Sequence, residues 1–220
     1  MNLTQFPDGE AVAQAAAAVV RSCCVEAVAA RGVFHWVLAG GTSPRRCYEL
    51  LRESDLPWAQ VQCWFGDERL LPPGDGERNE TMAREALLDH VLIPAAQIHA
   101  ITGSDPLLAA ASYSAEMAVV ERFDLILLGM GEDGHTASLF PNNPALDLPD
   151  LAVPVFNSPK PPPLRVSMGY RALNSHRRCL ILATGAGKQH PIARIQGGAH
   201  PPVARVERSE WLVDAAAMPS

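Results

Sequence analysis

Short apolar runs that end near glycine alternate along the chain with longer, alanine-rich segments. The runs VFHWVLA, VQCWF and DLILLGM are rich in β-branched, aromatic and aliphatic residues. Runs of this length and composition are typical of buried β-strands. Together with two further short segments, they predict strands at residues 33–39, 61–65, 124–130, 165–168 and 179–184.

The longer segments carry spaced charges and predict helices. Residues 10–30 are rich in alanine and valine, with few charges. Thr42 and Ser43 precede Pro44, which is the pattern of a helix N-cap and a first-turn proline. Asn79 is a candidate cap for a later helix, and Pro191 limits where the last helix can start. The predicted helices lie at residues 10–30, 42–52, 78–90, 106–122 and 187–196.

Strands that alternate with helices predict parallel pairing through right-handed crossovers, with helices on both faces of the sheet. The expected fold class is therefore α/β, a three-layer Rossmann-like sandwich with a mostly parallel sheet. We expect a single domain over residues 1–220. The proline-rich stretch SPKPPPLR at residues 158–165 could be a domain linker, but the strand and helix pattern continues on both sides, which favours a rigid loop.

Composition and charge argue against several classes of function. A net charge of −6 argues against non-specific nucleic-acid binding, which needs a cationic face. The five cysteines form no C-x-x-C pair, so free thiols in a reducing cytoplasm are expected rather than a disulfide framework or a zinc site. The first residues, MNLTQFPDGE, are acidic and lack a basic-then-apolar pattern, so we expect no signal sequence. No uninterrupted apolar stretch reaches the roughly 20 residues that span a bilayer.

Three polar, glycine-bearing turns follow three of the predicted strands. They read GGTSP at 40–44, GDER at 66–69 and GMGEDGH at 129–135. In open α/β sheets, ligands bind beyond the carboxyl ends of the strands, so the three turns are expected on one rim. This convergence predicts one active site.

The first two turns suit an anion. Gly40 and Gly41 let a ligand approach the backbone closely, and the helix that follows offers free N–H groups with a partial positive charge. Thr42 and Ser43 add hydroxyl donors. In the second turn, Arg69 could clamp a phosphate or carboxylate. Asp67 could orient that arginine, hold a sugar hydroxyl or align a histidine.

The third turn allows two interpretations. Gly129, Gly131 and Gly134 match the dinucleotide spacing G-x-G-x-x-G. That interpretation requires a long helix after the third glycine, and prolines at 141 and 144 leave room for only one or two helical turns. His135 instead follows Asp133 in a tight turn, which suits a general base that titrates near neutral pH.

Other chemical signals are weaker. No histidine lies in a zinc motif, Ser138 lacks a nucleophile context, and Cys63 lies inside a predicted buried strand. Two further cationic candidates stand near strand ends, Arg165 at a strand start and Lys188 in the turn TGAGK.

Taken in order, these pieces resemble the 6-phosphogluconolactonase family, within a NagB/RpiA-like fold group that includes glucosamine-6-phosphate deaminase. The motif FDLILLGMGEDGHTASLFP at 123–141 is the most specific. The matching segments run almost from end to end and are LAGGTSP (38–44), WFGDERLLPP (64–73), RNETM (78–82), NSPKPPPLRVSM (157–168), TGAGK (184–188) and WLVDAAA (211–217).

The resemblance implies hydrolysis of 6-phospho-D-glucono-1,5-lactone to 6-phosphogluconate in the pentose phosphate pathway, with no nucleotide cofactor and no metal. It implies a sugar-phosphate lactone as the partner. We expect neither nucleic acid nor membrane as a partner, and a monomer or small homo-oligomer, although the sequence does not settle the oligomeric state. By motif position, the catalytic residues are His135, Asp133, Asp67 and Arg69. The substrate- and phosphate-binding residues are Gly40, Gly41, Thr42, Ser43, Asn79, Arg165 and Lys188.

Two other functions remain open at this stage. The related deaminases carry a glutamate five residues after the motif histidine, and here that position is Phe140, which cannot transfer a proton. A non-catalytic sugar-phosphate sensor would keep the phosphate loop. Such regulators usually carry a helix-turn-helix segment, and the chain before residue 33 leaves little room for one.

Overall fold

Seven parallel strands form the central sheet of the computed structural model, which describes residues 1–219. The strands run in the order β1-β10-β9-β6-β2-β3-β5, and every neighbouring pair is parallel. The predicted α/β class with a mostly parallel sheet is thereby confirmed. The strand bounds are β1 Asn2–Phe6, β2 Phe34–Leu38, β3 Val61–Phe65, β5 Ile98–His99, β6 Phe123–Gly129, β9 His176–Ala183 and β10 Glu210–Asp214.

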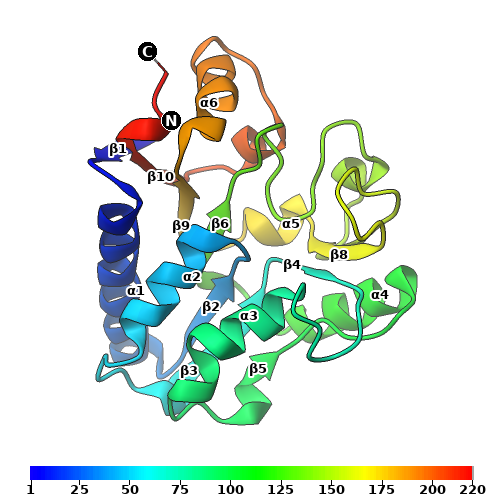
Figure 1. Cartoon of the computed structure of the whole chain (residues 1–220). Helices are drawn as coiled ribbons and strands as arrows, with labels where there is room; N and C mark the ends of the chain where they lie inside the picture. The colour runs from blue at the N-terminus through cyan, green and yellow to red at the C-terminus, as the bar shows by residue number, and fades with distance from the viewer. Residues whose placement is uncertain (220) are drawn as a thin grey trace.

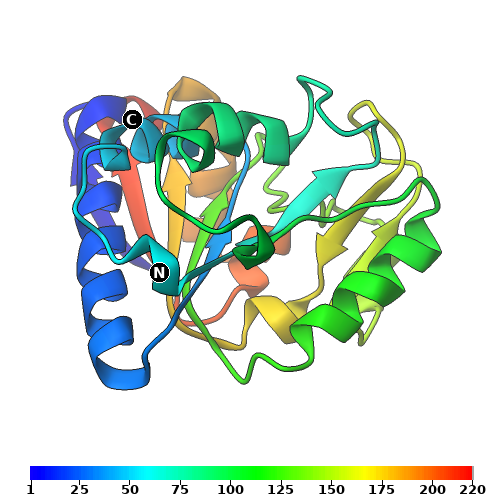
Figure 2. The same cartoon turned by 90° about the horizontal axis from the view of Figure 1, so that it is seen from below.

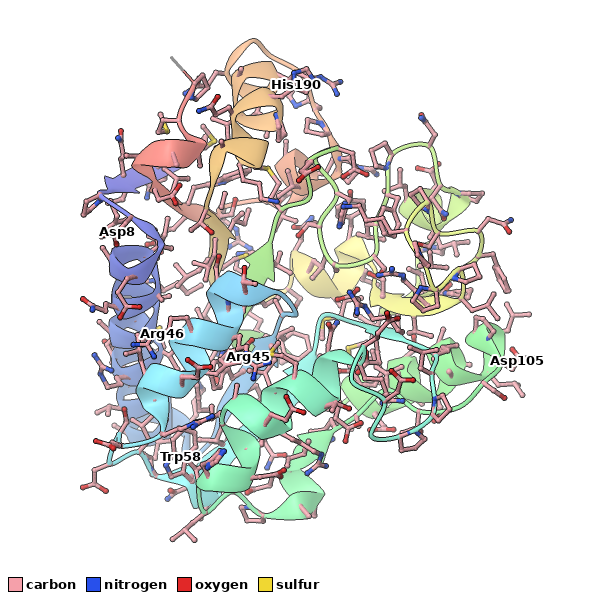
Figure 3. All side chains as sticks on the ribbon, viewed as in Figure 1. Asp8, Arg45, Arg46, Trp58, Asp105 and His190 are labelled. Carbon is pink, nitrogen blue, oxygen red and sulfur yellow. The ribbon has the colours of Figure 1, made fainter. Side chains whose placement is uncertain are left out.

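Helices flank this sheet, and α2 and α3 lie on the opposite face from α5 (Figures 1 and 2). Asp8 and Asp105 cap the first helix and the fourth by accepting backbone N–H bonds (Figure 3). The helix bounds are α1 Gly9–Arg31, α2 Thr42–Leu51, α3 Asn79–Ala86, α4 Pro106–Met117, α5 Tyr170–Leu173 and α6 Gln189–Gln196.

By length and composition, α1 could cross a membrane, contrary to the expectation from the sequence. Isolated charges interrupt the run, but the mean hydropathy of an 18-residue window still reaches 1.5. In the fold, 44% of that window is buried. Val12, Ala16 and Val20 belong to the hydrophobic core, so the apolar face of α1 has a partner inside the protein.

A second, smaller sheet is antiparallel and was not predicted. Its order is β4-β8-β7, with bounds β4 Asp67–Arg69, β8 Arg165–Met168 and β7 Ala152–Val155. Gly66 joins the two sheets, because its N–H donates to Leu38 O at 2.9 Å and its carbonyl accepts from Met168 N at 2.7 Å. The triplet Asp-Glu-Arg, expected as a loop, is therefore a short strand of this second sheet.

Several predicted elements differ at their ends. The helix expected at 78–90 stops at Ala86 and resumes as a 3-10 turn, and the helix expected at 106–122 stops at Met117. Gly41, not Thr42, caps α2, and it does so without a side-chain hydrogen bond. The strands β1, β5, β7 and β10 were not predicted. The first two are short edge strands, which carry a weak hydrophobic pattern.

Two buried tyrosines close the carboxyl ends of β2 and β3. The Tyr48 hydroxyl lies 2.9 Å from both the N and the O of Ala39. The Tyr113 hydroxyl does the same for Phe65, at 2.8 Å from N and 3.1 Å from O. Each hydroxyl therefore satisfies one backbone donor and one acceptor where strand pairing ends.

We expect Tyr48→Phe and Tyr113→Phe each to lower the free energy of unfolding by about 1–3 kcal/mol, because a buried N–H and C=O lose their partner. Urea denaturation measures this loss. Tyr170→Phe is the matched control, since its half-buried hydroxyl donates only to Pro202 O. The control should cost about 0.5–1.5 kcal/mol. A control loss as large as the other two would contradict the assignment.

Candidate active site

A cavity of about 330 Å³ lies beyond the carboxyl ends of the central strands. The chain moves outward in one direction from β2 through β3 to β5, and in the other from β6 through β9 to β10. The turns after β6 and β2 therefore diverge at a topological switch point, the usual ligand site of an open α/β sheet. The cavity is lined by Ala39, Gly40, Gly41, Asp67, Arg69, Asn79, Gly129, Met130, Gly131, His135, Ala137, Lys160, Pro161, Arg165 and Lys188.

The turn after β6 pairs His135 with Asp133. The Nδ1 atom of His135 lies 2.5 Å from Asp133 Oδ1, and the His135 backbone N–H donates to the same oxygen at 3.1 Å. Donation from Nδ1 to the carboxylate leaves Nε2 as the ring nitrogen with a free lone pair. No helix follows within residues 132–143, which removes the dinucleotide interpretation of the three glycines.

Gly131 is required by the close approach of this histidine. A Cβ atom added at Gly131 would lie 2.0 Å from His135 Nδ1 and 2.7 Å from Asp133 Oδ1. The turn is closed by hydrogen bonds from Gly131 N to His135 O and from Thr136 Oγ1 to Gly129 O, both 2.8 Å. The glycine therefore makes room for the imidazole and its carboxylate.

The environment keeps His135 neutral near pH 7. Burial lowers the pKa of His135 below its ordinary value, and this outweighs Asp133, which acts in the opposite direction. Burial by itself would raise the pKa of Asp133, but the hydrogen bonds and charge of His135 bring it below its ordinary value. The pair is therefore a neutral imidazole beside an ionised carboxylate, which is the state of a general base.

Asp67 faces a different set of partners. Its Oδ1 accepts from Asn79 Nδ2 at 3.0 Å, and its Oδ2 accepts from Ser138 Oγ at 2.5 Å. The same Asn79 amide also donates to the Asp67 carbonyl at 2.8 Å. Gly40 is the close neighbour of this group, since a Cβ there would lie 2.0 Å from Asn79 Oδ1. Between the two aspartates, Asp133 is the one that contacts His135.

Four cationic side chains line the cavity. Arg69 donates to Glu77 O, and its Nε is buried with no partner within residues 1–219. Arg165 binds the proline-rich loop: its guanidinium donates to Lys160 O, Pro161 O and Pro162 O at 2.9–3.2 Å. Burial lowers the pKa of Lys188 despite nearby carboxylates.

The GGTSP turn contributes its glycines to the cavity but not its hydroxyls. Thr42 is exposed, and Ser43 Oγ lies 2.6 Å from Thr184 Oγ1. Neither residue lines the cavity, since the backbone turns outward into α2 after Gly41. Arg45 and Arg46 lie on the outer side of this helix and pair with glutamates at the surface (Figure 3).

Sequence reasoning did not select Ser138 or Lys160. Ser138 is fully buried and bonds Asp67, and Arg165 Nη1 lies 3.5 Å from its hydroxyl. Lys160 lines the cavity from the proline-rich loop. Its position inside a rigid proline run was the sequence signal that could have identified Lys160. No local signal existed for Ser138, because its partner is 71 residues away.

Phe140 packs against the ring of His135. Its ring is fully buried, and its centroid is 4.4 Å from that of His135. The guanidinium carbon of Arg165 lies 5.6 Å from the same ring. The position five residues after the histidine is therefore an apolar support.

A profile of the glucosamine-6-phosphate isomerases/6-phosphogluconolactonase family matches residues 7–213. A 6-phosphogluconolactonase of Streptomyces coelicolor is 38% identical in an alignment of 236 positions that covers 96% of this chain and 90% of that protein. The protein of the same name from Mycobacterium tuberculosis is 37% identical, with 98% and 97% covered.

Solved structures of similar proteins share the fold of this chain. The 6-phosphogluconolactonase of Thermotoga maritima superposes with a TM-score of 0.89 at 28% identity, over 97% of this chain and 99% of that one. A monomeric glucosamine-6-phosphate deaminase of the NagB superfamily gives a TM-score of 0.84 at 18% identity, over 99% and 98%, and shows a shared fold. The chain belongs to the glucosamine-6-phosphate isomerase/6-phosphogluconolactonase family.

Proposed function

We propose that this protein hydrolyses 6-phospho-D-glucono-1,5-lactone to 6-phospho-D-gluconate, as its relatives' names imply for them. The observation that carries the proposal is the Asp133–His135 pair, which faces a cavity with four cationic side chains. A neutral base beside a polarised ester and a site for a phosphate dianion are the two requirements of this reaction.

In the proposed mechanism, water attacks the lactone carbonyl carbon directly. His135 Nε2 takes a proton from the water as the new C–O bond forms. The tetrahedral intermediate then collapses, the bond from the carbonyl carbon to the ring oxygen breaks, and His135 returns the proton to that oxygen. An activated lactone needs no covalent nucleophile, and every step uses groups of this chain and water. The absence of a cofactor or metal requirement remains a prediction.

The two aspartates have separate roles in this scheme. Asp133 holds the imidazole tautomer and stabilises the imidazolium after the first proton transfer. Asp67 bonds Asn79 at the start of α3 and Ser138 in the segment that follows His135, and so holds these two segments together beside the cavity. The Asp67 carboxylate bonds Asn79 and Ser138 and not His135, so we assign the alignment of the histidine to Asp133.

Arg69, Lys188 and Lys160 are the cations that we assign to the substrate phosphate and the developing oxyanion. Arg165 has three carbonyl partners already and holds the loop that carries Lys160. The backbone of Gly40 and Gly41 adds N–H donors at the start of α2.

Deamination with isomerisation is the nearest alternative. It needs a second proton-transfer group near the histidine, and Phe140 occupies that position in contact with the imidazole. A sensor without activity is the second alternative, and it would bind 6-phosphogluconate without turning over the lactone.

The cellular setting is also a proposal. Five free cysteines, four of them buried, suit a reducing cytoplasm. We propose that the protein works there as a monomer or small homo-oligomer, independent of nucleic acid and membrane, on a small sugar phosphate.

His135→Ala is the direct test of the function. We expect the catalysed rate with fresh lactone to fall about 10²–10⁴-fold, because the base and acid are lost together. The assay follows lactone loss against the spontaneous rate. His190→Ala is the control, since His190 is exposed on α6 (Figure 3). Wild-type rates in His135→Ala would exclude the mechanism, and no turnover by the wild-type protein would favour the sensor.

The pH profile tests the role of Asp133. Because burial lowers the pKa of His135, we expect kcat/KM to persist at pH 6.5 and to fall at lower pH, where the imidazole gains a proton. Asp133 raises the pKa of His135, so Asp133→Asn should move this acidic limb to still lower pH and also reduce kcat. Both proteins are assayed with the same substrate, so any titration of the substrate itself affects the two pH profiles equally. A limb that moves to higher pH would contradict the pairing.

Gly131→Ala tests the geometry of the turn. The added methyl group would collide with the imidazole, so we expect kcat to fall about 10²-fold or more while the protein stays folded. Gly76→Ala is the matched control, because no atom lies within 4 Å of a Cβ there. Lactone hydrolysis and a thermal melt are measured for both variants. Full activity in Gly131→Ala would show that His135 does not need its observed position.

A further inference from the structure

Glu68 is a fully buried carboxylate that the proposed reaction does not use. It lies in β4 between two residues that line the cavity, Asp67 and Arg69, but does not line the cavity itself. Burial of a charged carboxylate is costly unless hydrogen bonds replace its water. Its partners therefore indicate what it is there to hold.

Three backbone N–H groups donate to Glu68. Oε1 accepts from Arg69 N at 2.9 Å and from Asn79 N at 2.7 Å, and Oε2 accepts from Glu80 N at 2.8 Å. The first donor belongs to β4 and the other two belong to the first turn of α3. One side chain therefore fastens the strand to the start of a helix, across the intervening segment of residues 70–78.

Both fastened elements carry residues of the cavity. Arg69 supplies a guanidinium with an unpartnered Nε, and Asn79 supplies the amide that holds Asp67. A negative charge at the N-terminus of α3 also matches the positive end of the helix dipole. Loss of the Glu68 carboxylate would free two walls of the cavity to move relative to each other.

We propose that Glu68 is a positioning residue for catalysis: its carboxylate joins β4 to α3 and so fixes the Arg69 guanidinium and the Asn79 amide around the substrate. The kinetic part of this inference rests on the proposed lactonase activity. The structural part, the three shared hydrogen bonds, does not.

Several charged or titratable groups surround Glu68. From α3, Arg78 Nη2 lies 3.7 Å from Oε2 and also bonds the Glu80 carboxylate. Asp67 and Arg69 flank Glu68 on its own strand, and its charge also reaches Arg165 on β8 and Tyr113 on α4. Burial raises the pKa of Glu68 to about 7, although the three N–H groups and Arg78 act against this.

Glu68→Gln is the informative substitution. A glutamine has one oxygen acceptor, so its NH₂ group would face a backbone N–H, and at least one of the three bonds is lost. Glu80→Gln is the matched control. It removes a neighbouring carboxylate that binds Arg78 and Arg84, and it leaves all three bonds to Glu68 in place.

We expect Glu68→Gln to lower kcat/KM for the lactone about tenfold in the wild-type background, and at most about threefold in an Arg69→Ala background, because the two residues act as one unit. Glu80→Gln should stay within about threefold of wild type. An equal fall in both backgrounds would overturn the proposal, since a merely structural role would be additive. A fall no larger than that of the control would also overturn it.

A second measurement uses the wild-type protein. It tests the shared hydrogen bonds even if Glu68→Gln does not fold or if the protein has no lactonase activity. The amide ¹H and ¹⁵N signals of Arg69, Asn79 and Glu80 are followed by NMR from pH 5.5 to 8.5. We expect the three signals to titrate together with one midpoint near 7. Independent midpoints for the three signals would overturn the shared carboxylate. No lactone turnover with a common midpoint would instead refute the proposed function alone.

Discussion

The parallel alignment of β6 and β2 at the centre of the sheet is the constraint on which the site depends. Their carboxyl ends meet at one edge, and the chain leaves that edge in opposite directions. The turn with His135 and the turn with Gly40 therefore face each other across a gap that no crossover fills. Gly66 then carries the neighbouring strand out of the large sheet, which places Asp67 and Arg69 on a third side of the same cavity.

The cavity is held from behind by buried polar groups rather than by apolar packing alone. Asp67, Glu68, Arg78 and Arg165 are all at least nine-tenths buried, and each has hydrogen-bond partners. Such groups are costly to bury unless they are paired, so the segments that carry them must adopt one arrangement. Rigid placement of charged groups is what a site for a small, highly charged substrate requires.

Much of the site could be predicted because its residues lie next to strand ends. Apolar runs located β2, β3, β6 and β9, and the glycine-bearing turns after them contain His135, Asp133 and Arg69. The small antiparallel sheet could not be predicted this way. Its strand β4 has three polar residues, and it is a strand only because β8, almost 100 positions later, pairs with it.

The sequence by itself determined the α/β class, the central strands β2, β3, β6 and β9, and the histidine turn, because each depends on residues close together in sequence. Only the tertiary structure decided which aspartate contacts His135, that Thr42 and Ser43 point away from the cavity, and that Ser138, Lys160 and Glu68 support it. The physical reason is that each outcome depends on where distant segments of the chain come to lie. Asp133 is only two residues from His135, but Asp67 is excluded as its partner because the fold pairs Asp67 with Asn79 and Ser138. Strand order and register set the distances between such segments, and no local pattern encodes either.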